Sequence, residues 1–277
     1  MAVIKTQPYI KLQEIATNIT IDDPNWDIVD DNFSINKKLF NYQKEALENA
    51  VKVLWKYFVD LKENKEEFAK YYNDLDVLED LNIPLKNNKY ANLLKAYFEP
   101  QIKDGEEYIP FSQIINRMSF WMATGSGKTV IIVKLIEILH KLMKQNLIPK
   151  KEILFLTYRE DLINSFKKLV EEYNSGKPLD NQIILISLKE YEKEKSQNDF
   201  SNRVFYYRSD LISDERKENI LNFDEYLEII NGKKAGNWYL ILDEAHKGDK
   251  QDSKRQNLFS ILSQNGFLFN FSATFTH

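Results

Sequence analysis

The sequence predicts an α/β protein built on a parallel sheet with helices on both faces. In the second half of the chain, short apolar runs alternate with stretches of helical periodicity, which is typical of strands joined by crossover helices. A glycine-rich segment, Met-Ala-Thr-Gly-Ser-Gly-Lys-Thr at 122–129, lies between one such run and one such helix. A chain of 277 residues with 43% hydrophobic residues is long enough to bury this core.

The N-terminal part is expected to add helices to this sheet. Residues 1–39 are mixed in polarity and rich in acidic residues, so we expect an irregular lead-in with a short strand near Ala2–Ile4. Apolar residues then recur at helical spacing over 42–61. Charged, aromatic-rich segments follow, with a break near Asn82–Pro84. Residues 40–113 are therefore predicted to form one long helix followed by a helical insertion.

Residues 114–277 are expected to form the α/β sheet itself. Apolar runs predict strands at Met118–Met122, Ile153–Thr157, Ile183–Leu188, Tyr239–Leu242 and Phe267–Phe271. Helices are predicted between them at about Lys128–Lys144, Glu160–Tyr173 and Ser253–Gln264. The long polar stretch at about 192–235, which includes Phe205-Tyr206-Tyr207-Arg208, is predicted to be an insertion of helices and loops outside the sheet.

The glycine-rich segment has the residues of a phosphate-binding loop. Glycines permit positive backbone dihedrals and close approach to a phosphate, and the start of the following helix attracts an anion. Lys128 is expected to contact the β- and γ-phosphates of a nucleoside triphosphate, and the hydroxyl of Thr129 to ligate Mg²⁺. The usual pattern opens with a glycine, where this chain has Met122. The predicted cofactor-binding residues of the loop are Thr124, Gly125, Ser126, Gly127, Lys128 and Thr129.

The tetrapeptide Asp-Glu-Ala-His at 243–246 ends the fourth apolar run. Asp243 is expected to hold Mg²⁺, and Glu244 to act as the base that orients the attacking water. Taken alone, the tetrapeptide also fits an exposed acidic helix start, the less favoured of the two interpretations, and its pairing with the glycine-rich loop strengthens the catalytic one. Parallel sheets bind ligands at the carboxyl ends of their strands, so the two segments are predicted to meet.

With these motifs the chain resembles the first motor lobe of the superfamily 2 helicase-type ATPases of the DEAH class, which has a RecA-like fold. Four further stretches match that family: Phe40-Asn41-Tyr42-Gln43, Leu156-Thr157-Tyr158-Arg159-Glu160, Ile186-Ser187-Leu188 and Ser272-Ala273-Thr274. The resemblance implies that Gln43 contacts the adenine edge, and that Thr157 and Arg159 bind a nucleic-acid backbone. It also implies that Ser272 and Thr274 couple hydrolysis to strand binding, through contacts with His246.

Met122 at the opening position makes the chain similar to the helicase-type subunits of type I and type III restriction enzymes. Type I subunits carry a nuclease domain ahead of the motor, and a glutamine motif near residue 40 leaves no room for one, so the resemblance favours the type III (Res) subunit. It implies ATP and Mg²⁺ as cofactors, double-stranded DNA as substrate and a methyltransferase (modification) subunit as partner. The second motor lobe and nuclease of that family do not follow Thr274, so we expect an N-terminal fragment with weak or no activity.

Two other interpretations remain open, an RNA helicase of superfamily 2 and a non-catalytic module that binds nucleotide and pairs with another chain. Composition excludes several other classes. The net charge of −4 gives no global basic field, and the absence of cysteine excludes disulfides and thiolate metal sites. The start of the chain lacks a secretory signal, and no apolar run approaches the roughly 20 residues needed to cross a bilayer. A soluble, cytoplasmic protein with no membrane contact is therefore expected.

Overall fold

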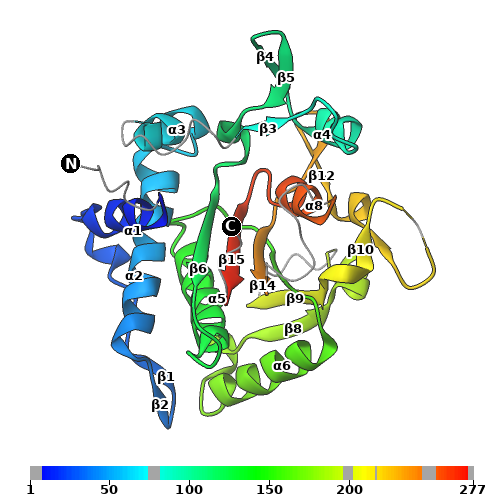
Figure 1. Cartoon of the computed structure of the whole chain (residues 1–277). Helices are drawn as coiled ribbons and strands as arrows, with labels where there is room; N and C mark the ends of the chain where they lie inside the picture. The colour runs from blue at the N-terminus through cyan, green and yellow to red at the C-terminus, as the bar shows by residue number, and fades with distance from the viewer. Residues whose placement is uncertain (1–7, 74–81, 196–201, 216, 245–253, 274–277) are drawn as a thin grey trace.

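A six-stranded parallel sheet forms the centre of the protein (Figure 1). The computed structural model describes residues 8–73, 82–195, 202–215, 217–244 and 254–273. The strand order is β6-β15-β14-β7-β9-β8, and every neighbouring pair is parallel. The strands are β6 (Arg117–Trp121), β7 (Ile153–Thr157), β8 (Ile184–Ser187), β9 (Arg203–Arg208), β14 (Tyr239–Asp243) and β15 (Phe267–Ser272). The predicted α/β class is thereby confirmed.

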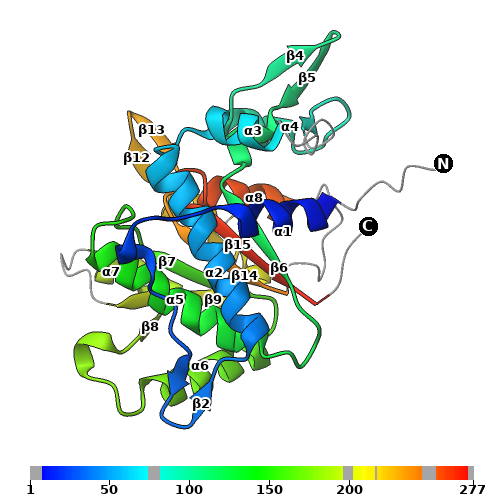
Figure 2. The same cartoon turned by 90° about the vertical axis from the view of Figure 1, so that its left-hand side faces the viewer.

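Alternate residues of the strands divide the apolar interior into two layers, because successive side chains of a strand point to opposite faces. In β7, Ile153 and Phe155 belong to one cluster, whereas Leu154 and Leu156 belong to the other. The first layer is covered by α2 (Asn41–Trp55), α5 (Lys128–Lys144) and α6 (Glu160–Asn174), and the second by α8 (Lys254–Leu262) (Figures 1 and 2). Both faces of the sheet are therefore buried, which is why its strands read as continuous apolar runs.

Strand β9 corrects the prediction for the stretch at 192–235. Residues 203–208 were expected outside the sheet, yet they lie within it between β7 and β8. Val204 and Phe205 are fully buried. Arg203 is buried as well, because its guanidinium pairs with Glu152. A strand that begins and ends with arginine does not resemble an apolar run. The guanidinium of Arg203 can be buried because it pairs with Glu152 and donates to the carbonyl of Glu194 at 3.0 Å.

The rest of that stretch does lie beyond the six strands. It contains the short helix α7 (Tyr191–Glu194), the parallel pair β10 (Ile212–Ser213) and β11 (Leu221–Asn222), and the antiparallel pair β12 (Glu228–Ile230) and β13 (Lys233–Ala235). These pairs belong to separate two-stranded sheets. The predicted insertion therefore contains one strand of the central sheet and two small accessory sheets.

The N-terminal 39 residues, expected to be irregular, contain helix α1 (Pro8–Asn18) and the hairpin of β1 (Asn32–Ser34) and β2 (Lys37–Lys38). The strand expected near Ala2–Ile4 falls outside the described residues. The helix predicted over 42–61 is present as α2, which continues into a π-helical turn at Lys56–Asp60.

The predicted helical insertion is a mixed α/β segment. It comprises α3 (Lys65–Asn73), β3 (Ile83–Pro84), α4 (Ala91–Tyr97), β4 (Gln101–Lys103) and β5 (Glu106–Ile109). The strands form an antiparallel sheet, and the β4–β5 hairpin projects from the body of the molecule (Figure 2). Its turn, Asp104-Gly105, has positive φ at both residues, so the Asp-Gly pair was an available hairpin signal. Among the described residues, no helix combines the length and apolar character that crossing a membrane requires.

Candidate functional site

The glycine-rich loop connects β6 to α5 at the carboxyl edge of the sheet. Gly125 and Gly127 have φ values of +83° and +78°, in the region that side chains other than glycine rarely adopt. Gly127 is the N-cap of α5, and its carbonyl accepts the N–H of Val130 at 2.9 Å, so the amides of the first two helical residues, Lys128 and Thr129, are the ones with no acceptor within the helix. The buried hydroxyl of Ser126 also has no hydrogen-bond partner among the described residues. The loop thus offers several donors to a phosphate group.

The loop lysine lies between the two acids that end β14. The Nζ atom of Lys128 is 3.0 Å from Oδ1 of Asp243 and 2.6 Å from Oε1 of Glu244. The Lys128 side chain retains 12% of its exposure, and both carboxylates are more than four-fifths buried. Residues more than one hundred positions apart therefore meet at one edge of the sheet, as the positions of the two motifs predicted.

Burial and charge act against each other in this group of three residues. Burial raises the pKa of Asp243 above its ordinary value, and the neighbouring ammonium of Lys128 offsets this only in part. Burial would lower the pKa of Lys128, but the carboxylates of Asp243 and Glu244 raise it overall. Lys128 is therefore held as an ammonium, the form that binds phosphate oxygens. Glu244 has φ of +60°, and its backbone N–H donates to Oδ1 of Asp243 at 2.9 Å.

The predicted adenine-contacting residue lies against the same loop. Gln43 is buried in the first turn of α2, and its Nε2 donates to the carbonyl of Ser126 at 3.0 Å. Its Oε1 accepts the backbone N–H of Phe40 at 3.0 Å. The amide therefore keeps one N–H and one lone pair for a further partner. A Cβ atom on Gly127 would lie 2.5 Å from Nε2 of Gln43, so glycine is required there for close approach.

A second contact to the loop was missed by the sequence analysis. The hydroxyl of Tyr42 donates to the same Ser126 carbonyl at 2.7 Å. The rings of Tyr42 and Phe40 are stacked, with centroids 5.7 Å apart, and both remain exposed. Two aromatic residues on either side of Asn41 were the available signal in the sequence.

The residues expected to bind nucleic acid lie at the neighbouring strand ends. Thr157 ends β7 opposite Asp243, but its side chain is fully buried and its hydroxyl has no hydrogen-bond partner among the described residues. Arg159 is 54% exposed and forms two hydrogen bonds with Asp161, at 2.8 and 2.7 Å. Of these two expected contacts, Arg159 presents its side chain to solvent and Thr157 does not.

The predicted coupling residues are only partly within the described structure. Ser272 ends β15, next to the phosphate loop, and its carbonyl accepts the N–H of Met122 at 3.0 Å. His246 and Thr274 fall outside the described residues, so their expected contact with one another is not described. Arg208, which ends β9 opposite Thr157, forms a second two-fold hydrogen bond with Asp210 at this edge, at 3.1 and 2.7 Å.

The side chains at the site fit a cation that is bound together with a nucleotide. Within the described ranges, no group of three or more histidine, cysteine, aspartate or glutamate side chains could hold a metal ion. Mg²⁺ is commonly bound through one or two protein ligands, several waters and the phosphates of the substrate. The Thr129 hydroxyl in the first turn of α5 and the Asp243 carboxylate match that requirement.

A comparison with protein families finds one match over most of the chain. The family described as "Type III restriction enzyme, res subunit" matches residues 36–277. Among solved structures, the crystal structure of the UvsW helicase from bacteriophage T4 is matched with a TM-score of 0.34 and 13% sequence identity. That match covers 78% of this chain and 70% of the other. None of the curated proteins matches the chain.

Proposed function

The chain belongs to the family of type III restriction enzyme res subunits, and from that premise we propose that it binds Mg²⁺-ATP as the first motor lobe of a translocase on double-stranded DNA. As a superfamily 2 helicase-type protein with a RecA-like sheet, it is an ATPase module. The observation that carries the proposal is the contact of Lys128 with both Asp243 and Glu244 at the mouth of the glycine-rich loop.

Each of these residues has a separate role in the proposed reaction. The loop amides and Lys128 bind the β- and γ-phosphates. Thr129 and Asp243 would hold a Mg²⁺ ion, which when bound would supply positive charge against the charge that develops on the phosphates during transfer. Glu244 accepts a proton from the attacking water. The ammonium of Lys128 must exchange its two carboxylates for phosphate oxygens, which frees both acids for their roles.

The nucleic-acid partner is proposed from the family and from the surface next to the site. Arg159 and Arg208 lie at the carboxyl ends of adjacent strands, each oriented by an aspartate two residues further along. An oriented guanidinium is suited to phosphate oxygens, because its remaining N–H groups have a fixed direction. Double-stranded DNA is the substrate, and a methyltransferase subunit of a restriction system is the partner.

The proposal is tested by measuring nucleotide-dependent binding of duplex DNA, and of RNA with the same sequence, to the Glu244→Gln variant. This substitution retains the shape of the side chain but cannot accept the proton, so Mg²⁺-ATP stays bound and unhydrolysed. ATP is expected to raise the affinity for DNA in this variant and to leave Lys128→Ala unaffected. Tighter binding of RNA would favour an RNA helicase, and no ATP binding by Glu244→Gln would refute the assignment of the site.

A further inference from the structure

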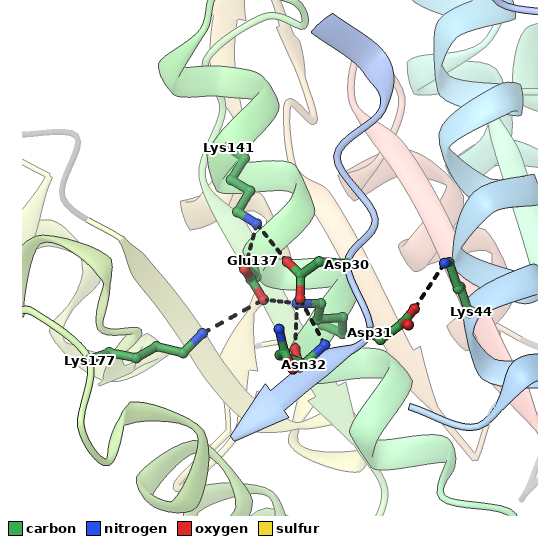
Figure 3. A network of polar contacts seen from close by, with 8 residues as sticks. Asp30, Asp31, Asn32, Lys44, Glu137, Lys141 and Lys177 are labelled. Atoms are coloured by element: carbon green, nitrogen blue, oxygen red, sulfur yellow. Dashed lines mark hydrogen bonds and ion pairs between the residues drawn. The ribbon is translucent and has the colours of Figure 1, made fainter. Parts of the chain in front are cut away.

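Three residues ahead of the glutamine motif connect the two helices that hold the nucleotide site. We call Asp30–Asn32 the bridging segment. Figure 3 shows the side chain of Asp30 directed toward α5 and that of Asp31 directed toward Lys44 on α2. Two neighbouring carboxylates therefore contact two different helices. None of these residues belongs to the nucleotide-binding or catalytic groups described above.

On the α5 side, the segment is held by a fully buried lysine. The Nζ atom of Lys134 donates hydrogen bonds to Oδ1 of Asp30 at 3.0 Å and to the carbonyl of Asn32 at 2.8 Å, and it forms an ion pair with Oε2 of Glu137 at 2.8 Å. Lys141 contacts Asp30 and Glu137 from the next turn, at 3.3 and 2.7 Å. A buried ammonium requires such partners, so the position of the segment along α5 is fixed.

The carboxylates of Asp30 and Glu137 are kept ionised by the ammonium groups of Lys134 and Lys141. Burial works against the charged form of Glu137, but Lys134 and Lys141 hold its pKa below the ordinary value. Burial has the same effect on Asp30, and the same two lysines also keep its pKa low. Both acids are thus charged at neutral pH, and their contacts with the lysines in Figure 3 are ion pairs.

On the α2 side, the segment contacts both neighbours of the glutamine motif. Oδ1 of Asp31 is 2.9 Å from Nζ of Lys44, the residue that follows Gln43. The Asp31 carbonyl accepts the N–H of Leu39 at 2.8 Å, immediately before the N-cap of α2 at Phe40. Asp31 therefore determines where α2 begins and how its first turn is oriented.

These contacts form a closed path around the site. The path runs from the phosphate loop into α5, from Lys134 to the bridging segment, from Asp31 to α2, and from Gln43 back to Ser126. The amide of Gln43 is thus positioned from two directions. One is its hydrogen bond to the loop, and the other is the attachment of its helix to α5.

We propose that Asp30 and Asp31 are positioning residues for adenine recognition. They hold the first turn of α2 against α5 so that the unused N–H and lone pair of Gln43 match the acceptor N7 and donor N6 of adenine. Guanine has the acceptor O6 where adenine has the donor N6, so the same orientation of the Gln43 amide does not match guanine. This inference rests on the proposed function, because it requires Gln43 to contact the base.

The test compares the ATP and GTP affinities of the full chain, with Asp30→Asn and Asp31→Asn as the variants. Asp30 borders an open cavity of about 300 Å³, so asparagine is accommodated there without leaving a buried hole. Dissociation constants for fluorescent ATP and GTP are measured with Mg²⁺ present. The ratio of the two affinities is expected to fall by about fivefold in each variant, the effect of one neutral hydrogen bond.

The matched control is Lys37→Gln, which removes an exposed ion pair of the same hairpin. Lys37 lies 2.8 Å from Glu172, with both side chains 40% exposed, so this ion pair joins the hairpin to α6 rather than to α2. It is expected to keep the wild-type preference for ATP. A merely structural role for the bridging segment would weaken ATP and GTP binding equally, and the affinity ratio would then stay unchanged.

The Gln43→Glu variant separates failure of this inference from failure of the proposed function. Loss of the ATP preference in Gln43→Glu, with the preference intact in both aspartate variants, would overturn the positioning role and leave the assigned site standing. An unchanged preference in Gln43→Glu would refute the adenine contact itself, and the positioning role with it. Combining Asp31→Asn with Gln43→Glu is expected to add no further loss of selectivity, because both changes act on one amide.

Discussion

Lys128 and Lys134 of helix α5 each lie between two carboxylates, and they differ in what surrounds them. Lys128, the first residue of the helix, contacts the two acids that follow β14, with 12% of its side chain exposed. Lys134, in the middle of the helix, contacts Asp30 and Glu137, with 1% of its side chain exposed. The second lysine also donates to the carbonyl of Asn32.

The difference shows what separates a structural ion pair from a ligand-binding one. The ammonium of Lys134 donates two hydrogen bonds, is paired with the carboxylates of Asp30 and Glu137, and has 1% of its side chain exposed, so a ligand cannot reach it. Lys128 has two acceptors among the described residues and lies beside a loop of exposed backbone amides. A phosphate can replace its partners without leaving a charge buried alone.

Replacing each lysine by methionine is expected to destabilise the protein to different extents. Lys134→Met leaves Glu137 without its ammonium partner and the Asn32 carbonyl without its donor, and should lower the free energy of unfolding by about 3 kcal/mol. Lys128→Met should lower it by about 1 kcal/mol, because burial already raises the pKa of Asp243 and this carboxyl can take up a proton when the ammonium is removed. Urea denaturation measures both values.

For nucleotide binding, the Lys128 variant should show the larger effect and the Lys134 variant the smaller one. Lys128→Met is expected to weaken binding of Mg²⁺-ATP by about a hundredfold or more, whereas Lys134→Met should retain binding wherever it remains folded. Titration with a fluorescent ATP analogue distinguishes the two. A loss of binding in folded Lys134→Met as large as that in Lys128→Met would contradict the division between a structural and a ligand-binding lysine.

A third ionisable group on α5, His140, shows the effect of burial on a side chain that forms no ion pair with a carboxylate among the described residues. Burial lowers the pKa of His140 to about 4, and its Nε2 lies 3.2 Å from the carbonyl of Arg203. Because the folded-state pKa lies below the ordinary value of 6.5, its contribution to stability is complete above pH 6.5. That contribution, about 3 kcal/mol, should be lost as pH falls through 6.5 toward 4.

His140→Gln provides the comparison for that pH dependence. Glutamine can still donate to the Arg203 carbonyl, but it does not titrate. Unfolding free energies of the two proteins should therefore converge as pH falls from 6.5 to 4, on top of the acid losses that both share. If the unfolding free energies of the two proteins instead fall in parallel between pH 6.5 and 4, His140 does not cause this pH dependence.

The smallest effect is expected for Lys141, the exposed member of the cluster around Lys134. Its side chain is 38% exposed, so solvent screens its contacts with Asp30 and Glu137. Lys141→Gln should lower the free energy of unfolding by about 1 kcal/mol or less, and high salt should remove the difference. The effect of Lys134→Met should persist in salt. Equal salt dependence of the two variants would mean that burial does not separate them.

Much of the fold and of the site was predictable because it depends on contiguous residues. The helix over 128–144 and the strand over 153–157 have their predicted bounds, since a turn or a pleat repeats within a few positions. The chemistry of the glycine-rich loop and of the acids at 243–244 was also predictable, because each motif consists of a few contiguous residues. Their meeting followed from the general rule that parallel strands end at one edge of a sheet.

The sequence by itself determined the α/β class, the phosphate loop and the acids that face it. Tertiary structure alone decided that β9 enters the sheet, and that Lys134 meets Asp30 across 104 positions of the chain. It also decided that Tyr42 and Gln43 hold the loop from another helix. Periodicity fixes which face of an element is buried, but not which distant element covers it. A buried charge is stable only after the fold has supplied its partner.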